Sequence, residues 1–257
     1  MYLIDSHCHL NFDGLADRLP EVFANMRAQQ VGQALAISVS RESFAEVFAI
    51  AENNGHIFCT IGVHPDRRDA EEFSVAEMVA QARHPKVVGI GETGLDYYWC
   101  KGDLAWQHRR FADHIQAANE AGLPVVVHTR DAAADTLRLL KECNMRAGVI
   151  HCFSEDVAFA KAALDLGLYI SFSGIVTFKN APLIQEAAKY VPADRMLVET
   201  DSPFLAPVPK RGKPNEPSYV RYTAEFLAKL RGETLEQIAE TTTENFYRLF
   251  SKVPRTA

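Results

Sequence analysis

The chain has 257 residues, of which 47% are hydrophobic and 23% are charged, so it can build one large domain or two small ones. Its formal net charge of -6 argues against a protein that coats nucleic acid electrostatically, because such proteins are usually basic. No apolar stretch approaches the roughly 18 residues of a membrane span. The five cysteines are scattered and unpaired in sequence, which favours reduced thiols. The first apolar run is interrupted by Asp5 and has no basic region before it, so it does not resemble a signal peptide. We therefore expect a cytoplasmic protein that does not associate with a membrane.

Eight apolar runs of strand length occur along the chain. Most are continuous rather than alternating and are rich in Val, Ile and Leu, which is typical of parallel strands covered on both faces. In chain order they are Tyr2–Asp5, Gln33–Val39, Ile57–Val63, Lys86–Gly91, Leu123–Val127, Ala147–Ile150, Leu168–Phe172 and Arg195–Glu199.

Amphipathic segments with helical spacing separate most of these runs, and two more follow the last one. Glycines just past several of them supply the left-handed residue that ends a helix. The expected helices are Leu15–Gln29, Glu42–Glu52, Ala105–Ala121, Ala133–Glu142, Asp156–Leu166, Pro182–Tyr190, Tyr219–Arg231 and Leu235–Phe250.

Eight strand–helix units in about 250 residues match a (β/α)₈ TIM barrel, an α/β fold. A doubly wound open sheet is the alternative, but it would need a glycine fingerprint after the first strand, which is absent. The proline-rich stretch 206–218 follows the last strand and is interpreted as an ordered loop over the barrel mouth rather than a linker. The sequence therefore predicts a single domain over residues 1–257.

Polar side chains that can bind metal follow the predicted strands at their carboxyl ends, where barrels of this kind place their sites. Buried polar groups are costly without partners, so packing alone does not explain them. They are His7 and His9 after the first strand, His64 after the third, Glu92 after the fourth, His128 after the fifth, His151 after the sixth, and Glu199 and Asp201 after the eighth.

Histidines and carboxylates without a cysteine cluster suit divalent cations such as Zn²⁺ or Mn²⁺, and Mg²⁺ suits the carboxylates. Four histidines at such positions, together with Glu92 and Asp201, exceed the needs of one tetrahedral ion. Two divalent cations that share a carboxylate and a water would account for all six. Asp201 could then accept the proton of that water and pass it to the leaving group.

The same motifs, taken in order, resemble the TatD-related metal-dependent hydrolase (DNase) family of amidohydrolase-like barrels. They are Asp5-Ser6-His7-Cys8-His9-Leu10, Gly62-Val63-His64-Pro65, Gly91-Glu92-Thr93-Gly94-Leu95-Asp96, His128-Thr129-Arg130-Asp131, His151-Cys152-Phe153-Ser154 and Glu199-Thr200-Asp201-Ser202-Pro203. The resemblance implies that His7, His9 and Asp201 hold one ion, that His128 and His151 hold the other, and that Glu92 bridges them. It also implies metal-dependent hydrolysis of DNA, of the 3′–5′ exonuclease type. Glu155, where the family often has Gly, and Phe204, where Tyr is common, depart from its pattern.

Several residues beside the predicted ligands have two possible roles. His64 could contact a substrate phosphate or be a turn residue beside Pro65, and Arg130 could bind phosphate or pair with Asp131. Asp96 could orient a ligand histidine or cap the turn that follows it.

Two surface features near the predicted mouth are candidates for substrate contact. Lys210, Arg211 and Lys213 form a basic cluster on the loop after the last strand, which could bind phosphate or simply be solvated. The aromatic run 97–99 could stack on a base or form the packing core of a lid.

The expected partner is DNA or another phosphodiester, and no obligate protein partner is indicated. The alternative function is hydrolysis of a small amide, ester or lactone in the same barrel class. A protein that no longer turns over substrate is disfavoured because all six ligand positions are filled.

Overall fold

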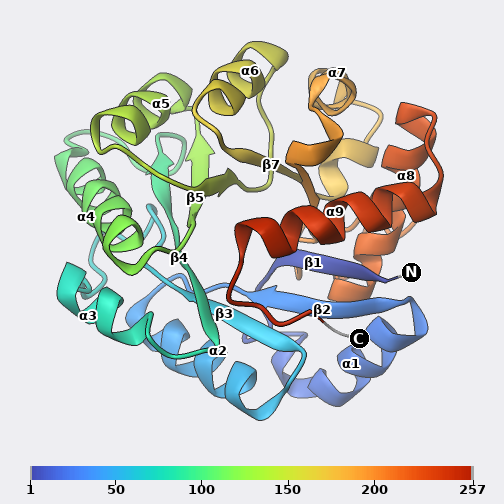
Figure 1. Ribbon diagram of the computed structural model, residues 1–257, viewed down its shortest axis with the longest axis horizontal. Coiled ribbons are helices and arrows are strands. Elements are labelled where there is room, and N and C mark those ends of the chain that lie inside the picture. Colours follow the sequence, from blue (N-terminus) through green and yellow to red (C-terminus); the bar gives the residue numbers. More distant parts are fainter. Residues whose placement is uncertain (1, 256–257) are drawn as a thin grey trace.

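The computed structural model describes residues 2–255; of the predicted domain 1–257, only positions 1, 256 and 257 lie outside it. Its eight strands form one parallel sheet in the order β1 to β8, and helices surround this sheet as the TIM barrel requires (Figure 1). The strands are β1 (Leu3–Cys8), β2 (Val31–Ala36), β3 (Ile57–Ile61), β4 (Val87–Asp96), β5 (Val125–Arg130), β6 (Gly148–Ile150), β7 (Tyr169–Phe172) and β8 (Met196–Val198).

The helices lie close to their predicted positions, with one addition. The sequence pattern does not predict helix α3, in the β3–β4 connection; it begins at a capping box in which the side chains of Ser74 and Glu77 each bond the other residue's backbone. The helices are α1 (Leu19–Ala28), α2 (Arg41–Asn53), α3 (Val75–Gln81), α4 (Ala105–Ala121), α5 (Ala133–Glu142), α6 (Val157–Asp165), α7 (Pro182–Tyr190), α8 (Val220–Arg231) and α9 (Leu235–Leu249). None in the described chain is long and apolar enough to cross a membrane.

The core has two layers. The larger one lies between the strands and the outer helices, and the smaller one fills the inside of the barrel with residues such as Ile4, Leu35 and Val126. Phe246 and Phe250, on and just after α9, belong to this inner cluster, and α9 lies across the barrel in Figure 1. The side chain of Asn245 on the same helix donates to the backbone oxygens of Ala193 and Met196, at the amino end of β8. Helix α9 therefore closes the amino-terminal end of the barrel and leaves the carboxyl end for a site.

The barrel closes between β8 and β1 through polar contacts rather than a long ladder. The buried carboxylate of Asp5 accepts hydrogen bonds from the Thr200 backbone at 2.8 Å and from the Thr200 hydroxyl at 2.6 Å. The backbone N–H of Asp201 donates to the oxygen of His7, and that of His9 donates to the oxygen of Ser202. These contacts bring residues almost two hundred positions apart in sequence to the same end of the barrel.

Helix α4 carries a buried histidine that supports the loop after β3. The Nε2 atom of His114 accepts a hydrogen bond from the backbone of Val63 at 3.0 Å, and its Nδ1 atom lies 2.8 Å from the oxygen of Arg110. Burial, with the positive charge of Arg110 acting in the same direction, lowers the pKa of His114 from 6.5 to about 4. The ring is therefore neutral in the folded protein, as the bonds to Val63 and Arg110 require.

The lowered pKa of His114 predicts that this residue causes part of the loss of folding stability in acid. Below about pH 6.5 the unfolded chain takes up a proton at His114 that the folded chain resists until about pH 4, so stability falls as pH falls through this window. Between pH 7 and pH 5 the loss is about 2 kcal/mol. Denaturant titrations at pH 7 and pH 5 should show that the free energy of unfolding falls by this much more in the wild type than in His114→Gln. An equal fall in the two proteins would contradict the prediction.

Candidate metal centre

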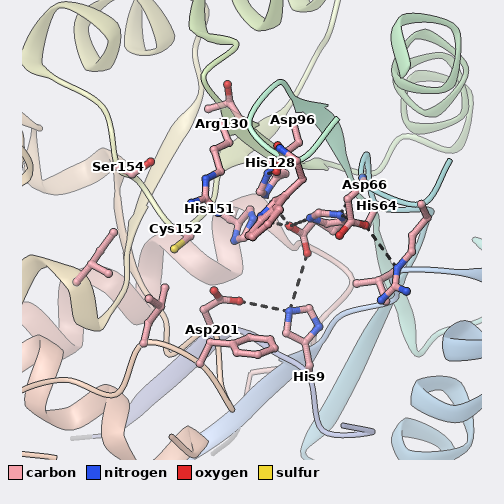
Figure 2. A pocket seen from close by; sticks show the side chains of 18 of the residues that line it. His9, His64, Asp66, Asp96, His128, Arg130, His151, Cys152, Ser154 and Asp201 are labelled. Atoms are coloured by element: carbon pink, nitrogen blue, oxygen red, sulfur yellow. Dashed lines mark hydrogen bonds and ion pairs between the residues drawn. The ribbon is translucent and has the colours of Figure 1, made fainter. Parts of the chain in front are cut away.

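The six predicted ligand residues meet at the carboxyl end of the barrel. A cavity of about 620 Å³ opens there, and Figure 2 shows His9 and Asp201 together on one side of it, with His64, His128 and His151 on the other. His7 is fully buried, within reach of the same carboxylates. His7 lies within β1, Glu92 within β4 and His128 within β5, so these strands extend through the predicted ligands rather than ending before them.

Glu92 lies at the centre, and its two carboxylate oxygens face different histidines. Its Oε2 atom is 3.3 Å from Nε2 of His7 and 4.0 Å from Nε2 of His9. Its Oε1 atom is 2.6 Å from Nε2 of His151 and 3.2 Å from Nδ1 of His128. The carboxylate thus lies between two groups of imidazoles, as a bridging ligand would.

Asp201 joins the group on the Oε2 side. Its Oδ1 atom is 3.3 Å from Nε2 of His9 and 3.7 Å from Nε2 of His7. Its backbone lies in the left-handed region, with φ of 55°, and its N–H is fixed by the oxygen of His7. Its side chain is 14% exposed, so it faces the cavity.

The backbone before Glu92 requires glycine. Gly91 has φ of 138°, and a Cβ atom on it would lie 2.6 Å from the oxygen of Val126 on the neighbouring strand. This close approach of β4 to β5 brings Glu92 and His128 to the same wall of the cavity.

The unpaired ring nitrogens show that these residues fit a metal. Both nitrogens of His7 and of His151 are buried and lack a hydrogen bond among the described residues, although carboxylate oxygens lie close to them. Buried polar atoms without partners are costly. These nitrogens lie close to carboxylate oxygens but do not form hydrogen bonds with them, which is how ligand atoms are arranged around a shared cation. Three sets of ligand atoms each lie within 4.8 Å of one another: His7, His9 and Asp201; His7, Glu92 and His151; and His64, Glu92 and His128.

The electrostatics of the cluster point in the same direction. Burial alone would raise the pKa of Glu92, but the surrounding His151, His64 and His7 hold that pKa well below its usual value. Burial would lower the pKa of His64, but the carboxylates of Glu92 and Asp66 raise it to about 9. The buried carboxylate therefore keeps its charge only with positive charge beside it, which protons or divalent cations supply.

Two outer carboxylates contact the predicted ligand histidines from behind. Oδ2 of Asp96 is 3.0 Å from Nε2 of His128, the position expected of a residue that orients a ligand. Oε1 of Glu199 is 3.4 Å from Nδ1 of His151 and also accepts the backbone N–H of Cys152. From the sequence Glu199 is only a strand-end carboxylate. Its contact with His151 joins the ends of β8 and β6, which lie two strands apart in the barrel, and such a contact has no local signal in the sequence.

The predicted substrate residues divide into two groups. His64 and Arg130 line the cavity, whereas Lys210, Arg211 and Lys213 are not among its lining residues. The guanidinium of Arg130 lies 4.1 Å from the ring centre of Tyr98, and no salt bridge to Asp131 occurs within residues 2–255. The loop cations pack elsewhere: Lys210 lies over the ring of Tyr219, and Arg211 lies over that of Phe178.

Aromatic side chains also line the walls of the cavity, and of these Phe12 was not expected from the sequence. Phe12 stacks on His9 with ring centres 4.7 Å apart, and Phe204 contacts the same pair of rings edge-on. Trp99 also lines the cavity and is 65% exposed. The cavity therefore combines a polar floor with exposed planar side chains.

Several known proteins resemble this chain in sequence or in structure. The sequence model described as TatD related DNase matches residues 4–251. The chain is 45% identical to the uncharacterized metal-dependent hydrolase YcfH of Escherichia coli K12, over 97% of this chain and 96% of that protein. It is 42% identical to the uncharacterized metal-dependent hydrolase YabD of Bacillus subtilis, over 96% of this chain and 98% of that protein. Among solved structures, the TatD homolog YJJV of Escherichia coli superimposes with a TM-score of 0.91 at 28% identity, over 98% of both chains.

Because both groups of ligands share Glu92, its charge is predicted to control metal binding. Divalent cations should raise the melting temperature of the wild type, by an amount that corresponds to about 2.7 kcal/mol per site at a hundredfold excess over Kd. Glu92→Gln should lose most of this rise, whereas Glu120→Gln, an exposed carboxylate on α4, should keep it. An equal metal-induced rise in Glu92→Gln and wild type would show that Glu92 is not a shared ligand.

Proposed function

The chain belongs to the TatD related DNase family of metal-dependent hydrolases, and we propose that its reaction is the hydrolysis of phosphodiester bonds in DNA, from the 3′ end. The observation that carries this proposal is the position of Glu92, with one oxygen toward His7 and His9 and the other toward His128 and His151. Two divalent cations, Mg²⁺, Mn²⁺ or Zn²⁺, would fit this arrangement. When bound they would lower the pKa of water and neutralise charge on an attacked phosphoryl group.

The protein side chains have separate tasks in this proposal. His7, His9 and Asp201 hold one position, His128 and His151 hold the other, and Glu92 is shared. Asp96 and Glu199 fix the orientation of His128 and His151 through their outer ring nitrogens. Asp201 faces the cavity and accepts the proton of the attacking water, which it then delivers to the leaving oxygen.

The walls of the cavity support a nucleic acid substrate. Arg130 and Arg67 line it and offer positive charge for phosphate, while Trp99 and Phe204 offer exposed rings on which a base can stack. A small amide, ester or lactone would need neither feature, although the same metal floor could hydrolyse it.

The reaction should depend on single ligand residues. His128→Ala and Asp201→Asn are each expected to abolish hydrolysis with the fold intact, because each removes an atom that holds a cation or moves a proton. The assay is a metal-replete screen of single-stranded DNA, RNA and small phosphodiesters against amides and lactones, with His84→Gln as a remote histidine control. Retained activity in either ligand variant would contradict the two-metal reaction, and turnover of amides or lactones alone would contradict the DNA substrate.

The basic loop is expected to act only on long substrates, because it does not line the cavity. Replacing Lys210, Arg211 and Lys213 with alanine should raise KM for a long single strand and leave KM for a small phosphodiester unchanged. The slope of the logarithm of DNA affinity against the logarithm of salt concentration should become less steep, by about 0.7 for each phosphate that the loop neutralises in the wild type. An unchanged slope would remove this loop from the substrate path.

A further inference from the structure

His64 occupies a position that resembles that of the two predicted histidine ligands beside it. Its Nε2 atom is 3.3 Å from Oε1 of Glu92, the same oxygen that His128 approaches at 3.2 Å and His151 at 2.6 Å. The rings of His64 and His128 contact each other edge-on, with centres 4.5 Å apart. Their side chains are similarly exposed, 15% and 17%, so both face the cavity from its wall. One carboxylate oxygen is thus surrounded by three imidazoles.

The outer ring nitrogens of these three histidines follow one pattern. A carboxylate lies behind each: Asp96 at 3.0 Å from His128, Glu199 at 3.4 Å from His151, and Asp66 at 2.7 Å from His64. Ligand histidines commonly donate their second N–H to such an acceptor, which fixes the tautomer and makes the inner nitrogen a better ligand. His7 and His9 lack this arrangement among the described residues, since they approach carboxylates only through Nε2 and none lies behind Nδ1. The three histidines near Oε1 of Glu92, including His64, therefore each have an outer carboxylate, which the two histidines near Oε2 lack.

Buried side chains of α4 hold the backbone around His64 and Asp96 together. Arg110 donates to the backbone oxygen of His64 at 2.8 Å, and Gln107 donates to that of Pro65 at 2.8 Å and to that of Asp96 at 3.2 Å. Both side chains are almost fully buried. The loop after β3 is thus fixed to the end of β4, and such preorganisation is what a coordination site needs.

We propose, resting on the two-cation site of the proposed function, that His64 is a third histidine ligand of the cation assigned there to His128 and His151, with Glu92 as the fourth protein group. The ligand atoms of His64, Glu92 and His128 lie within 4.8 Å of one another, and His151 approaches the same Glu92 oxygen at 2.6 Å. Three imidazoles and one carboxylate suit Zn²⁺ or Co²⁺, whereas Mg²⁺ prefers oxygen ligands. The two positions beside Glu92 then differ in kind: the first has two histidines and a second carboxylate, Asp201, and the second has three histidines. The position near His64 is accordingly the one that selects a nitrogen-binding metal.

The competing role for His64 is a contact to a substrate phosphate. The two roles make different predictions in the absence of substrate, so metal binding to the free protein separates them. This test is also independent of the proposed DNA hydrolysis, because it measures no turnover.

The experiment is a titration of the chelator-treated, full-length protein with Co²⁺, followed by visible absorption and calorimetry without nucleic acid. His64→Gln, whose amide can still contact a phosphate, is expected to weaken one of two sites at least tenfold and to change its absorption spectrum. Asp66→Asn should weaken the same site roughly 10- to 100-fold, as loss of an outer acceptor does. Arg68→Ala, an exposed residue on the same loop that does not line the cavity, is the matched control and should leave both affinities unchanged.

Two results would overturn the proposal. If both Co²⁺ affinities and the spectrum are unchanged in His64→Gln and Asp66→Asn, His64 is not a ligand. If the wild type binds a third equivalent that these variants alone lose, His64 belongs to a separate site rather than to that of His128 and His151. Unfolding curves of each variant without metal establish that the comparison is made between folded proteins.

Discussion

The arrangement of this site depends on one buried carboxylate. Glu92 is 2% exposed, and a charged group so deep in a protein is costly unless opposite charge surrounds it. Histidines from β1, β5, the β3 loop and the end of β6 supply the surrounding atoms, and each approaches one particular oxygen of the carboxylate. The division between the two oxygens is what separates one ligand group from the other. Without Glu92, the two groups of predicted ligands would have no residue in common.

The barrel provides this arrangement by closing on itself at the level of the site. Asp5 and Thr200 join β1 to the segment after β8, and the backbone of Asp201 bonds that of His7. Closure of the barrel and the first group of predicted ligands are thus one structural feature. On the other side, Gly91 allows β4 to approach β5 closely enough for Glu92 and His128 to face each other. The amino-terminal end of the barrel, covered by α9, contributes none of the predicted ligands.

The strand pattern predicted the barrel because continuous apolar runs and helical spacing are local properties. Helix α3 was missed because it is short, and its capping box lies in a polar loop. The alternation of His7 and His9 and the histidines at other strand ends indicated a metal site, since parallel strands bring their carboxyl ends to one rim. Sequence could not show that Glu199 lies behind His151, or that Lys210 and Arg211 pack on aromatic rings away from the cavity. Those contacts depend on the paths of loops and on which strand ends lie near one another, and neither has a local signature in the sequence.

The most direct test of the shared carboxylate is an anomalous difference map from crystals grown with Mn²⁺ or Zn²⁺. Two peaks on opposite sides of the Glu92 carboxylate are expected, one near His7, His9 and Asp201 and the other near His128 and His151. A single peak, or two peaks of which neither lies within coordinating distance of Glu92, would contradict the account.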